Sequence, residues 1–487
     1  MQDLYTILGV SPDASDEDIR HAYRQIARRL HPDVNKHPGA ARQFKDVSAA
    51  HDILGSISSR AQYDVKRRGQ VTKQYLDIRV TPSTQVVSQM SEPQVMYVLV
   101  ELSPDMKIGR EETSAPLNLT LVIDHSTSMS GARMDRTKIA AHKIIESLSK
   151  NDVLSVVTFA DRAEVLLKAA PLTDKNLARA MVSTIQAAGG TEMYSGLVLG
   201  YEQNQRYAGK NFVNHIILIT DGRTYGDEAN CIELAERCAK EGIGLSAMGI
   251  GEEWNDAFLD HLVSMTGGAS QYIASPNSVQ RFLEERVKSL GQSVAERVTI
   301  SVAPDPDVQI ESIFRITPNP QQLATNLDPL PVGQIQAQIT TSMLLTLLLP
   351  PLPEIGFRPF LRVVATADIL WDQYLDYRLV ADASIEVSAR PPKVEPPLAI
   401  LDALGKLTLY RMQLKAAEAA AKGDIKTATR TLENVATRLL ASGHTELANI
   451  AMSEARRLAN THALSEEGKK TLKYGTRMLL LTASDGT

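Results

Sequence analysis

The stretch LNLTLVIDHSTS, residues 117–128, decides the fold of the middle of this chain. It begins as an apolar run of strand length and ends in three polar side chains, Asp124, Ser126 and Ser128. Similar apolar runs occupy residues 152–159, 215–220 and 243–249. Amphipathic segments of helical period lie between them, at residues 135–148, 175–187 and 228–240. Strands that alternate with helices form a parallel sheet covered on both faces, so the pattern predicts a doubly wound α/β domain.

Oxygen-bearing side chains follow the ends of these strands. Asp124, Ser126 and Ser128 follow the first strand, Asp221 follows the strand at 215–220, and Thr191 lies in a Gly-Gly-Thr loop ahead of another helix. In open parallel sheets, binding sites form at the carboxyl ends of the strands. Two carboxylates and three hydroxyls suit a hard divalent cation, and few protein charges favour Mg²⁺, with Mn²⁺ or Ca²⁺ as alternatives.

Together, these segments resemble the von Willebrand factor A family and its metal-ion-dependent adhesion site, over about residues 116–292. The resemblance implies that Ser126 and Ser128 bind the metal directly and that Thr191 does so directly or through water. It implies that Asp124 and Asp221 mainly hold coordinated waters. A Glu or Asp of a protein target would then complete the coordination shell.

Two residues depart from the family pattern, because His125 and Thr127 replace the small residues common between the ligands. His125 can either crowd the metal or add a contact at its rim. Enzymatic alternatives fit less well. A phosphoryl-transfer nucleophile would require a second aspartate at Ser126, and neither a G-x-S-x-G elbow nor a G-x-G-x-x-G loop after the first strand is present. We therefore expect no enzymatic activity.

The first seventy residues carry a different motif, the tripeptide His31-Pro32-Asp33. An apolar stripe at helical spacing predicts a helix from Asp16 to Leu30, with Ser15 and Asp18 as a capping box. A second helix, with Phe44, Val47, His51 and Leu54 on its inner face, must pair with the first as an antiparallel hairpin. Because Pro32 cannot extend a helix, we expect the tripeptide to project from the tip of this hairpin.

This arrangement resembles the J domain of the DnaJ co-chaperone family over about residues 1–68. The resemblance rests on the short leading helix at 3–8, the tripeptide, Arg60 and Tyr63-Asp64. It implies docking onto a DnaK-class heat-shock chaperone and stimulation of its ATPase, with His31, Pro32 and Asp33 as the trigger. The expected docking surface comprises Tyr23 and three basic residues, Arg20, Arg24 and Arg28.

Several features of this region depart from the family. Gln25 replaces a residue that is often basic, and Ser56–Ser59 lacks the usual Ser-Asp-Pro turn. No Gly/Phe-rich linker and no zinc-type cysteine repeats follow, so client selection must lie downstream. Nucleic acid is a weaker alternative partner, because residues 1–70 carry 11 Lys/Arg against 9 Asp/Glu, a net charge of only +2, and no interleaved aromatic set.

The flanks of the central domain read as strands. These are expected at residues 75–80, 94–102, 297–302, 334–340, 360–367 and 378–386. Since no helical crossovers separate them, we predict an antiparallel β-sandwich interrupted by the central domain, serving either as a partner surface or as a rigid mount. After a proline-rich join the chain is helical to about residue 482, broken at Gly423 and Gly443 into antiparallel pieces. A tetratricopeptide-like hairpin is an alternative for these pieces, although no repeat of fixed period is detectable.

The predicted fold class is therefore a multidomain protein of α, α/β and β parts: a J domain, a von Willebrand A domain inserted in a β-sandwich, and a C-terminal helical bundle. The expected domains are 1–70, then 71–115 with 293–392, then 116–292, and finally 398–483.

Composition sets further bounds. Values of 43% hydrophobic and 22% charged residues over 487 positions are ordinary for a globular protein, and the net charge of -5 argues against a globally basic nucleic-acid binder. Cys231 and Cys238 are too far apart in one helix for a disulfide, so we expect two packed thiols. No signal peptide is visible, and the most apolar run, 343–349, is too short to span a bilayer. We expect a soluble, cytoplasmic protein without a membrane span.

Two functional hypotheses follow. The first is a J-domain co-chaperone that grips a protein target through the metal and recruits a DnaK-class ATPase to it. The alternative is a metal-dependent interaction scaffold, with an AAA+ ATPase as a candidate partner, in which the J domain serves only for localisation.

Overall fold

The computed structural model of the chain describes residues 3–68, 73–105, 115–209, 212–221, 226–250, 254–273, 287, 290–318, 320–370, 372 and 374–480. The outer ends of the expected first and last domains, residues 1–2, 69–70 and 481–483, lie outside these ranges. The chain divides into two compact units, Met1–Thr113 with Ser293–Ile400 and Ser114–Gln292 with Leu401–Thr487. Among the described residues, no helix is long and apolar enough to cross a bilayer.

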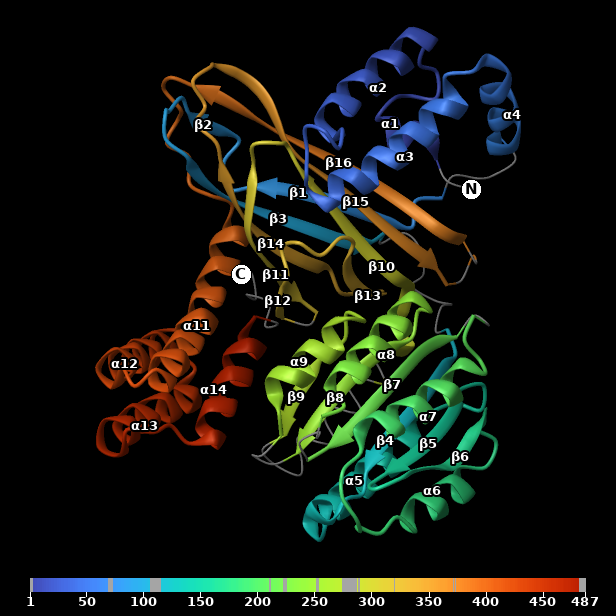
Figure 1. The fold of residues 1–487 in the computed structure, drawn as a ribbon, viewed down its shortest axis with the longest axis vertical. Coiled ribbons are helices and arrows are strands. Elements are labelled where there is room, and N and C mark those ends of the chain that lie inside the picture. The colour runs from blue at the N-terminus through green and yellow to red at the C-terminus, as the bar shows by residue number, and fades with distance from the viewer. Residues whose placement is uncertain are drawn as a thin grey trace. The chain divides into compact units, whose positions relative to one another are not determined.

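The first unit begins with a small helical domain (Figure 1). Its helices are α1 (Leu4–Leu8), α2 (Asp16–Leu30), α3 (Pro38–Leu54) and α4 (Ile57–Arg68). Helix α2 has the predicted bounds because Ser15 Oγ accepts a hydrogen bond from the Asp18 backbone N–H at 3.1 Å, and the Asp18 carboxylate accepts one from the Ser15 N–H at 2.9 Å. The helix ends where Pro32 forces extended backbone at His31.

The rest of the first unit is a β-sandwich. One sheet has the order β1-β3-β14-β11-β12 and the other β13-β10-β15-β16-β2. The bounds of the strands before the central domain are β1 (Leu76–Pro82), β2 (Val86–Ser88) and β3 (Gln94–Pro104). The strands after it are β10 (Ser293–Pro304), β11 (Gln309–Thr317), β12 (Gln321–Leu323), β13 (Leu330–Gln336), β14 (Thr341–Leu349), β15 (Gly356–Ile369) and β16 (Tyr374–Ser388). Strands from both sides of the central domain thus build one sandwich, which confirms the predicted insertion.

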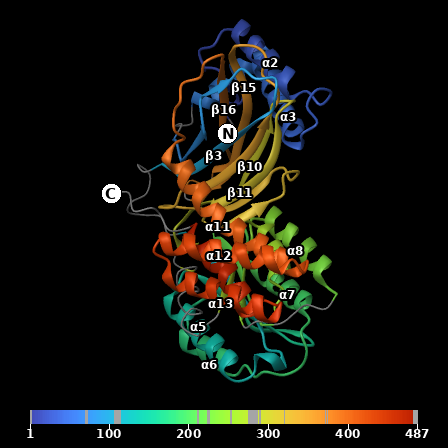
Figure 2. The same ribbon diagram turned by 90° about the vertical axis from the view of Figure 1, so that its left-hand side faces the viewer.

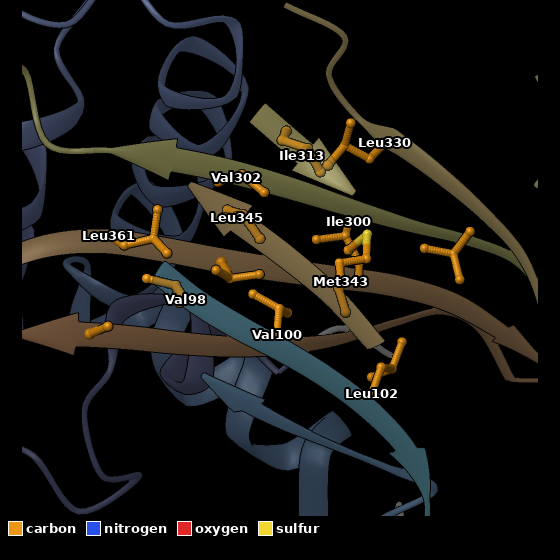
Figure 3. Packing of buried hydrophobic residues seen from close by; sticks show 14 of the residues in the cluster. Val98, Val100, Leu102, Ile300, Val302, Ile313, Leu330, Met343, Leu345 and Leu361 are labelled. Atoms are coloured by element: carbon orange, nitrogen blue, oxygen red, sulfur yellow. The ribbon is translucent and has the colours of Figure 1, made fainter. Parts of the chain in front are cut away.

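Alternating apolar side chains of the two sheets form the core of the sandwich. Val98 and Val100 from β3, Met343 from β14, and Ile300 and Val302 from β10 are buried against one another (Figure 3). Each strand directs every second side chain inward, so the sheets close over a continuous apolar layer.

The structure adds strands to the expected sandwich and corrects two expectations about it. The apolar run 343–349, for which no strand was expected, belongs to β14, which pairs with β3 and β11 within its sheet. The strand expected at 334–340 is the end of β13, which stops at Gln336. Pairing is not antiparallel throughout, because β2 pairs in parallel with β16 over three residues. The long chain between β2 and β16, which includes the central domain, supplies the connection that a parallel pair needs, so the absence of a short helical crossover did not exclude this pair.

The second unit opens with the expected α/β domain. Its sheet has the order β6-β5-β4-β7-β8-β9, in which β6 is antiparallel to β5 and the other neighbours are parallel. Its strands are β4 (Leu117–Asp124), β5 (Val153–Phe159), β6 (Ala163–Pro171), β7 (Val213–Thr220), β8 (Gly244–Ile250) and β9 (Ser270–Ile273). Its helices are η1 (Thr127–Met129), α5 (Ala132–Ser147), α6 (Lys175–Ser183), α7 (Met193–Gln205), α8 (Glu228–Lys240) and α9 (Asp256–Ser264).

Two details of this domain bear on the sequence predictions. Helix α6 ends at Ser183, four residues before its expected end. The hydroxyls of Ser183 and Thr184 donate to the carbonyl oxygens of Arg179 and Met181, which is how such residues compete with a continuing helix. Cys231 and Cys238 are free and buried as expected, and burial raises the pKa of both thiols to about 12.

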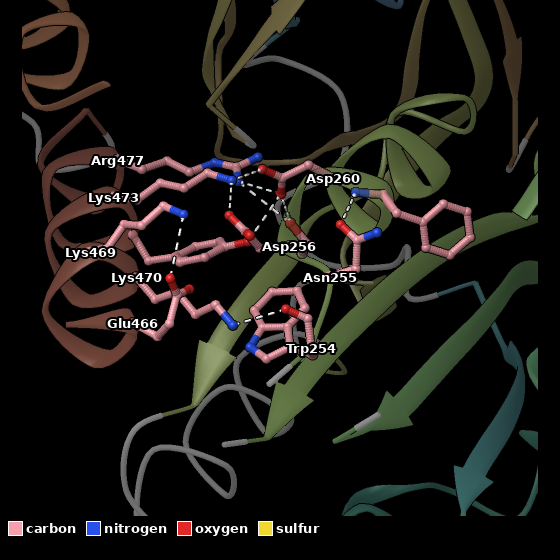
Figure 4. Close-up of polar contacts among 12 residues, drawn as sticks. Trp254, Asn255, Asp256, Asp260, Glu466, Lys469, Lys470, Lys473 and Arg477 are labelled. Carbon is pink, nitrogen blue, oxygen red and sulfur yellow. Dashed lines mark hydrogen bonds and ion pairs between the residues drawn. The ribbon is translucent and has the colours of Figure 1, made fainter. Parts of the chain in front are cut away.

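The C-terminal helices complete the second unit. They are α11 (Leu398–Ala421), α12 (Ile425–Ala441), α13 (Thr445–Thr461) and α14 (Glu466–Leu479). Figure 2 shows α12 and α13 side by side, with the turn at Gly443 between them. Helix α14 packs on the α/β domain, where Lys473 and Arg477 contact Asp260 of α9 (Figure 4).

Candidate functional site

Asp124 stands at the carboxyl end of β4, between β5 and β7. Its carboxylate is buried and accepts hydrogen bonds from the Ser126 backbone N–H at 2.8 Å and the Thr220 hydroxyl at 2.7 Å. Burial raises the pKa of Asp124 above its ordinary value, although the hydrogen bonds from Ser126 and Thr220 act in the opposite direction. A carboxylate desolvated in this way gains strongly from a nearby cation.

Asp221 follows β7 directly and joins the same cluster. Its Oδ1 accepts a hydrogen bond from Ser128 Oγ at 2.8 Å, and the hydroxyls of Ser126 and Ser128 lie 3.0 Å apart. Ser126 and Asp221 are each 2% exposed. The fold therefore places Asp124, Ser126, Ser128 and Asp221 in one hydrogen-bonded cluster at the strand ends.

The loop that carries Thr191 lies beside this cluster. The carbonyl oxygen of Gly189 accepts hydrogen bonds from Thr127 N at 3.0 Å and Thr127 Oγ1 at 2.9 Å. Asp161, just beyond β5, accepts a hydrogen bond from Gly190 N at 2.8 Å. A side chain at Gly189 would collide with Asp161, and Gly189 has a φ of 81°, so glycine is required there. These contacts bring half-buried Thr191 to the same edge of the sheet.

His125 and Arg133 border the cluster. A ring nitrogen of His125 lies 3.0 Å from the carbonyl oxygen of Gln186, so this side chain is fastened to the end of the segment after α6. Arg133, in the first turn of α5, pairs with the Asp221 carboxylate and donates to the Ser128 carbonyl oxygen at 3.2 Å. Sequence reasoning missed Arg133 and Asp161, because charged residues in a first helical turn or a loop usually face solvent.

The chemistry of this donor set fits a hard divalent cation. All the clustered groups present oxygen, which Mg²⁺, Mn²⁺ and Ca²⁺ prefer. Within the described ranges, no three His, Cys, Asp or Glu side chains converge into a metal-binding group. A metal at this cluster would therefore be bound mainly by serine and threonine hydroxyls and by water, with the carboxylates of Asp124 and Asp221 nearby.

The tripeptide His31-Pro32-Asp33 is exposed at the end of α2. His31 stacks edge-on against Phe44 of α3 with ring centroids 5.2 Å apart, and its Nδ1 accepts a hydrogen bond from Asp33 N at 3.2 Å. Lys36 donates to the Pro32 carbonyl oxygen at 2.7 Å. The loop is thus shaped by short local contacts while the Asp33 side chain remains 85% exposed.

The expected basic face also lies open. Arg20, Arg24 and Arg28 are exposed along α2, and Tyr23 stacks on His51 of α3 with ring centroids 4.0 Å apart. Arg60 fastens α4 by donating to Tyr5 Oη at 2.9 Å and to the Asp16 carboxylate at 3.1 Å. The structure thus presents the seven residues expected to meet a chaperone on one small helical domain.

Comparisons with known protein families match three segments of the chain. Residues 3–64 match the DnaJ domain, and residues 118–286 match the von Willebrand factor type A domain. The chain joins a J domain to a von Willebrand A domain. Residues 398–482, which include helices α11 to α14, match the Sll0103-like, C-terminal alpha-helical domain.

Curated relatives match either most of the chain or a short segment of it. The uncharacterized protein sll0103 of Synechocystis is 27% identical over 391 residues, which cover 77% of this chain and 90% of that protein. The chaperone protein DnaJ of Pediococcus pentosaceus is 54% identical over 63 residues, which lie in the J domain and cover 13% of this chain. This chain spans only 17% of that chaperone's length.

Solved structures share the fold. A von Willebrand factor type A protein from Catenulispora acidiphila aligns with a TM-score of 0.65 at 18% identity, covering 84% of this chain and 98% of that one. The ArnB paralog VWA2 from Sulfolobus acidocaldarius aligns with a TM-score of 0.51 at 14% identity, covering 84% and 100% of the two chains. The fold of most of this chain therefore recurs in other proteins.

Proposed function

We propose that this protein is a non-enzymatic J-domain co-chaperone that grips a protein target through a divalent metal and brings a DnaK-class chaperone ATPase to it. The observation that carries the proposal is the presence, in one chain, of an exposed His31-Pro32-Asp33 loop and a buried oxygen cluster around Asp124. One group is suited to recruiting a chaperone and the other to holding a cation.

The metal half of the proposal rests on the cluster at the ends of β4 and β7. Asp124, Ser126, Ser128, Thr191 and Asp221 would hold the ion, most naturally Mg²⁺. The ion would supply an electrophilic coordination position that a Glu or Asp of the target completes. Because Asp124 and Asp221 would mainly hold coordinated waters, the direct ligands would be neutral hydroxyls and water, and the cation would still favour a further anionic ligand.

Affinity capture tests whether the protein binds a target through the proposed metal. The tagged full chain should retain a target from lysate in Mg²⁺ and lose it in EDTA, and Asp124→Ala should lose it in both buffers. Ser130→Ala is the matched control, because the Ser130 hydroxyl donates to the Thr127 carbonyl oxygen and lies outside the cluster. Capture that is indifferent to both EDTA and Asp124→Ala would refute a metal-dependent grip.

The chaperone half rests on the exposed tripeptide and the basic face of α2. Electrostatic complementarity between such a face and an acidic partner speeds association and fixes register. The full chain should stimulate the steady-state ATPase of a DnaK-class chaperone, and His31→Gln should remove the stimulation. Metal-dependent capture without any stimulation would instead support an interaction scaffold, with an AAA+ ATPase as its candidate partner.

A further inference from the structure

The J domain is docked on the β-sandwich through a continuous polar interface. Two arginines of the J domain pair with aspartates of the sandwich. Arg29 Nε lies 2.8 Å from Asp305 Oδ1, and Arg42 Nε lies 3.0 Å from Asp328 Oδ2. In the opposite sense, Arg378 of β16 pairs with Asp46 of α3 at 2.6 Å. Charges of both signs alternate across the interface, which specifies one orientation and disfavours others.

Buried groups reinforce this docking. Gln43 of α3 is 1% exposed and donates to the Ser301 carbonyl oxygen of β10 at 3.1 Å. Arg362 of β15 is also 1% exposed and donates to the Ile7 carbonyl oxygen of α1. Ala303 of β10 belongs to the same hydrophobic cluster as the core of the four J-domain helices. The sandwich therefore completes the J-domain core instead of merely adjoining it.

The interface extends into the loop that carries the tripeptide. Asn35, two residues after Asp33, is 3% exposed, and its Nδ2 donates to the Pro304 carbonyl oxygen at 2.8 Å and to the Arg29 carbonyl oxygen at 3.1 Å. Arg29, two residues before His31, also reaches Asp382 of β16 at 3.3 Å. Both ends of the loop are thus tied to the sandwich.

The same docking leaves the chaperone-facing side free. Arg20, Arg24 and Arg28 are exposed, whereas Arg29, the next residue along α2, is 19% exposed at its side chain and faces the sandwich. The interface does not cover the tripeptide either. The docking therefore leaves the residues expected to meet a chaperone open to solvent.

We propose that the β-sandwich mounts the J domain in one fixed orientation and that Arg29 and Asn35 are positioning residues, which hold the His31-Pro32-Asp33 loop ready for the chaperone. The functional part of this inference rests on the proposed co-chaperone activity, whereas the docking does not. Preorganising the loop lowers the ordering cost of binding the chaperone. Fixing the orientation also sets where a recruited chaperone stands relative to the sandwich.

Gly39 offers a selective way to undock the J domain. It lies in the first turn of α3, and the atoms nearest to a Cβ there belong to the sandwich, namely the backbone of Val302 and the carboxylate of Asp328. Gly39→Ala should therefore push the domains apart without disturbing the J-domain interior. Lys45→Ala, an exposed change on the same helix, is the matched control. Asp46→Arg, with rescue by Arg378→Asp, provides an independent disruption.

The docking is tested by pulsed electron–electron double resonance, which measures the distance between two spin labels on the full chain. Spin labels at Asp52→Cys and Glu311→Cys, both exposed, report the distance between J domain and sandwich, while buried Cys231 and Cys238 stay unlabelled. One narrow distance should broaden in Gly39→Ala but not in Lys45→Ala. A broad distribution in the chain that carries only the labels would overturn the docking.

The positioning role is measured by chaperone ATPase titration. Gly39→Ala, and separately Asn35→Ala, should raise the concentration needed for half-maximal stimulation roughly threefold to tenfold. Equal titration curves, despite a broadened distance, would overturn the role of Arg29 and Asn35. If the unsubstituted chain gives no stimulation, the proposed function fails, and the spin-label distance still decides the docking.

Discussion

Glu296, on β10, couples the stability of the sandwich to pH. Burial and then the neighbouring Asp368 raise the pKa of its carboxyl to about 8, with Arg297 acting in the opposite direction. Glu296 Oε2 has no hydrogen-bond partner among the described residues. Between the unfolded value of 4.5 and about 8, the folded state therefore holds a proton that the unfolded state releases. The free energy of unfolding falls as pH rises through this window, by about 1.4 kcal/mol per pH unit.

Substituting Glu296→Gln should remove this contribution. We expect the stability of the sandwich, read from hydrogen exchange of β10 and β15 amides, to lose much of its decline between about pH 5.5 and about pH 7.5. An unchanged slope in the variant would show that Glu296 is already ionised in the folded state.

Ser128 is the residue at which the metal assignment is most easily tested. Its hydroxyl contacts both Ser126 and Asp221, and replacing it removes one proposed ligand without adding a charge. Ser128→Ala should weaken Mg²⁺ binding by roughly tenfold or more in calorimetric titration, whereas Ser130→Ala should leave it unchanged. Equal affinities in the two variants would place the ion elsewhere.

At the scale of elements, helix α14 is attached to the α/β domain by a buried charge cluster (Figure 4). The carboxylate of Asp260 in α9 forms ion pairs with Arg477 Nη1 and Lys473 Nζ, each at 2.8 Å. Burial by itself would raise the pKa of Asp260, but the two cations hold it well below its usual range. Lys470 also donates a hydrogen bond to the Trp254 carbonyl oxygen at 2.9 Å, so α14 contacts the chain beyond β8 as well as α9.

Asp260→Asn should loosen this attachment. It leaves the buried Arg477 without its carboxylate, which costs about 3 kcal/mol of unfolding free energy and should expose α14 amides to hydrogen exchange. Glu466→Gln is the control, because its pair with Lys469 is exposed on the same helix and should change stability by about 0.5 kcal/mol or less. Equal effects of the two substitutions would mean that α14 is held by apolar contacts alone.

Elements with a strong local signal were predictable from sequence. Helix α2 has its predicted bounds because the capping box at Ser15 and the proline at Pro32 both act locally. Helix α8 also begins and ends as predicted. By contrast, β14 carries a nearly unbroken apolar run, whose pairing with β3 depends on residues more than two hundred positions away. Local patterns do not encode such partners.

Some residues of the candidate site could likewise be predicted from sequence, whereas others could not. The serine and aspartate pattern after β4 led directly to the residues that the fold brings together with Asp221. Arg133, Arg29 and Asn35 could not be found this way, because each is an ordinary polar residue until the tertiary structure supplies its partner. The J-domain docking in particular depends on sandwich residues that are separated from α2 by the whole central domain.

For the whole molecule, the proposed function requires that the metal site and the J domain act on the same target. The metal site is proposed to grip a target and the J domain to direct a chaperone to it, so target release should require both. Stimulation of the ATPase and capture of a target are each necessary, but neither alone shows that one chain links them.

The most direct test loads the immobilised full chain with its captured target in Mg²⁺ and then adds a DnaK-class chaperone with ATP. We expect the target to be released in an ATP-dependent manner by the unsubstituted chain and to remain bound by His31→Gln, while Asp124→Ala captures none. Release from His31→Gln at the same rate, or release without ATP, would contradict the proposed coupling.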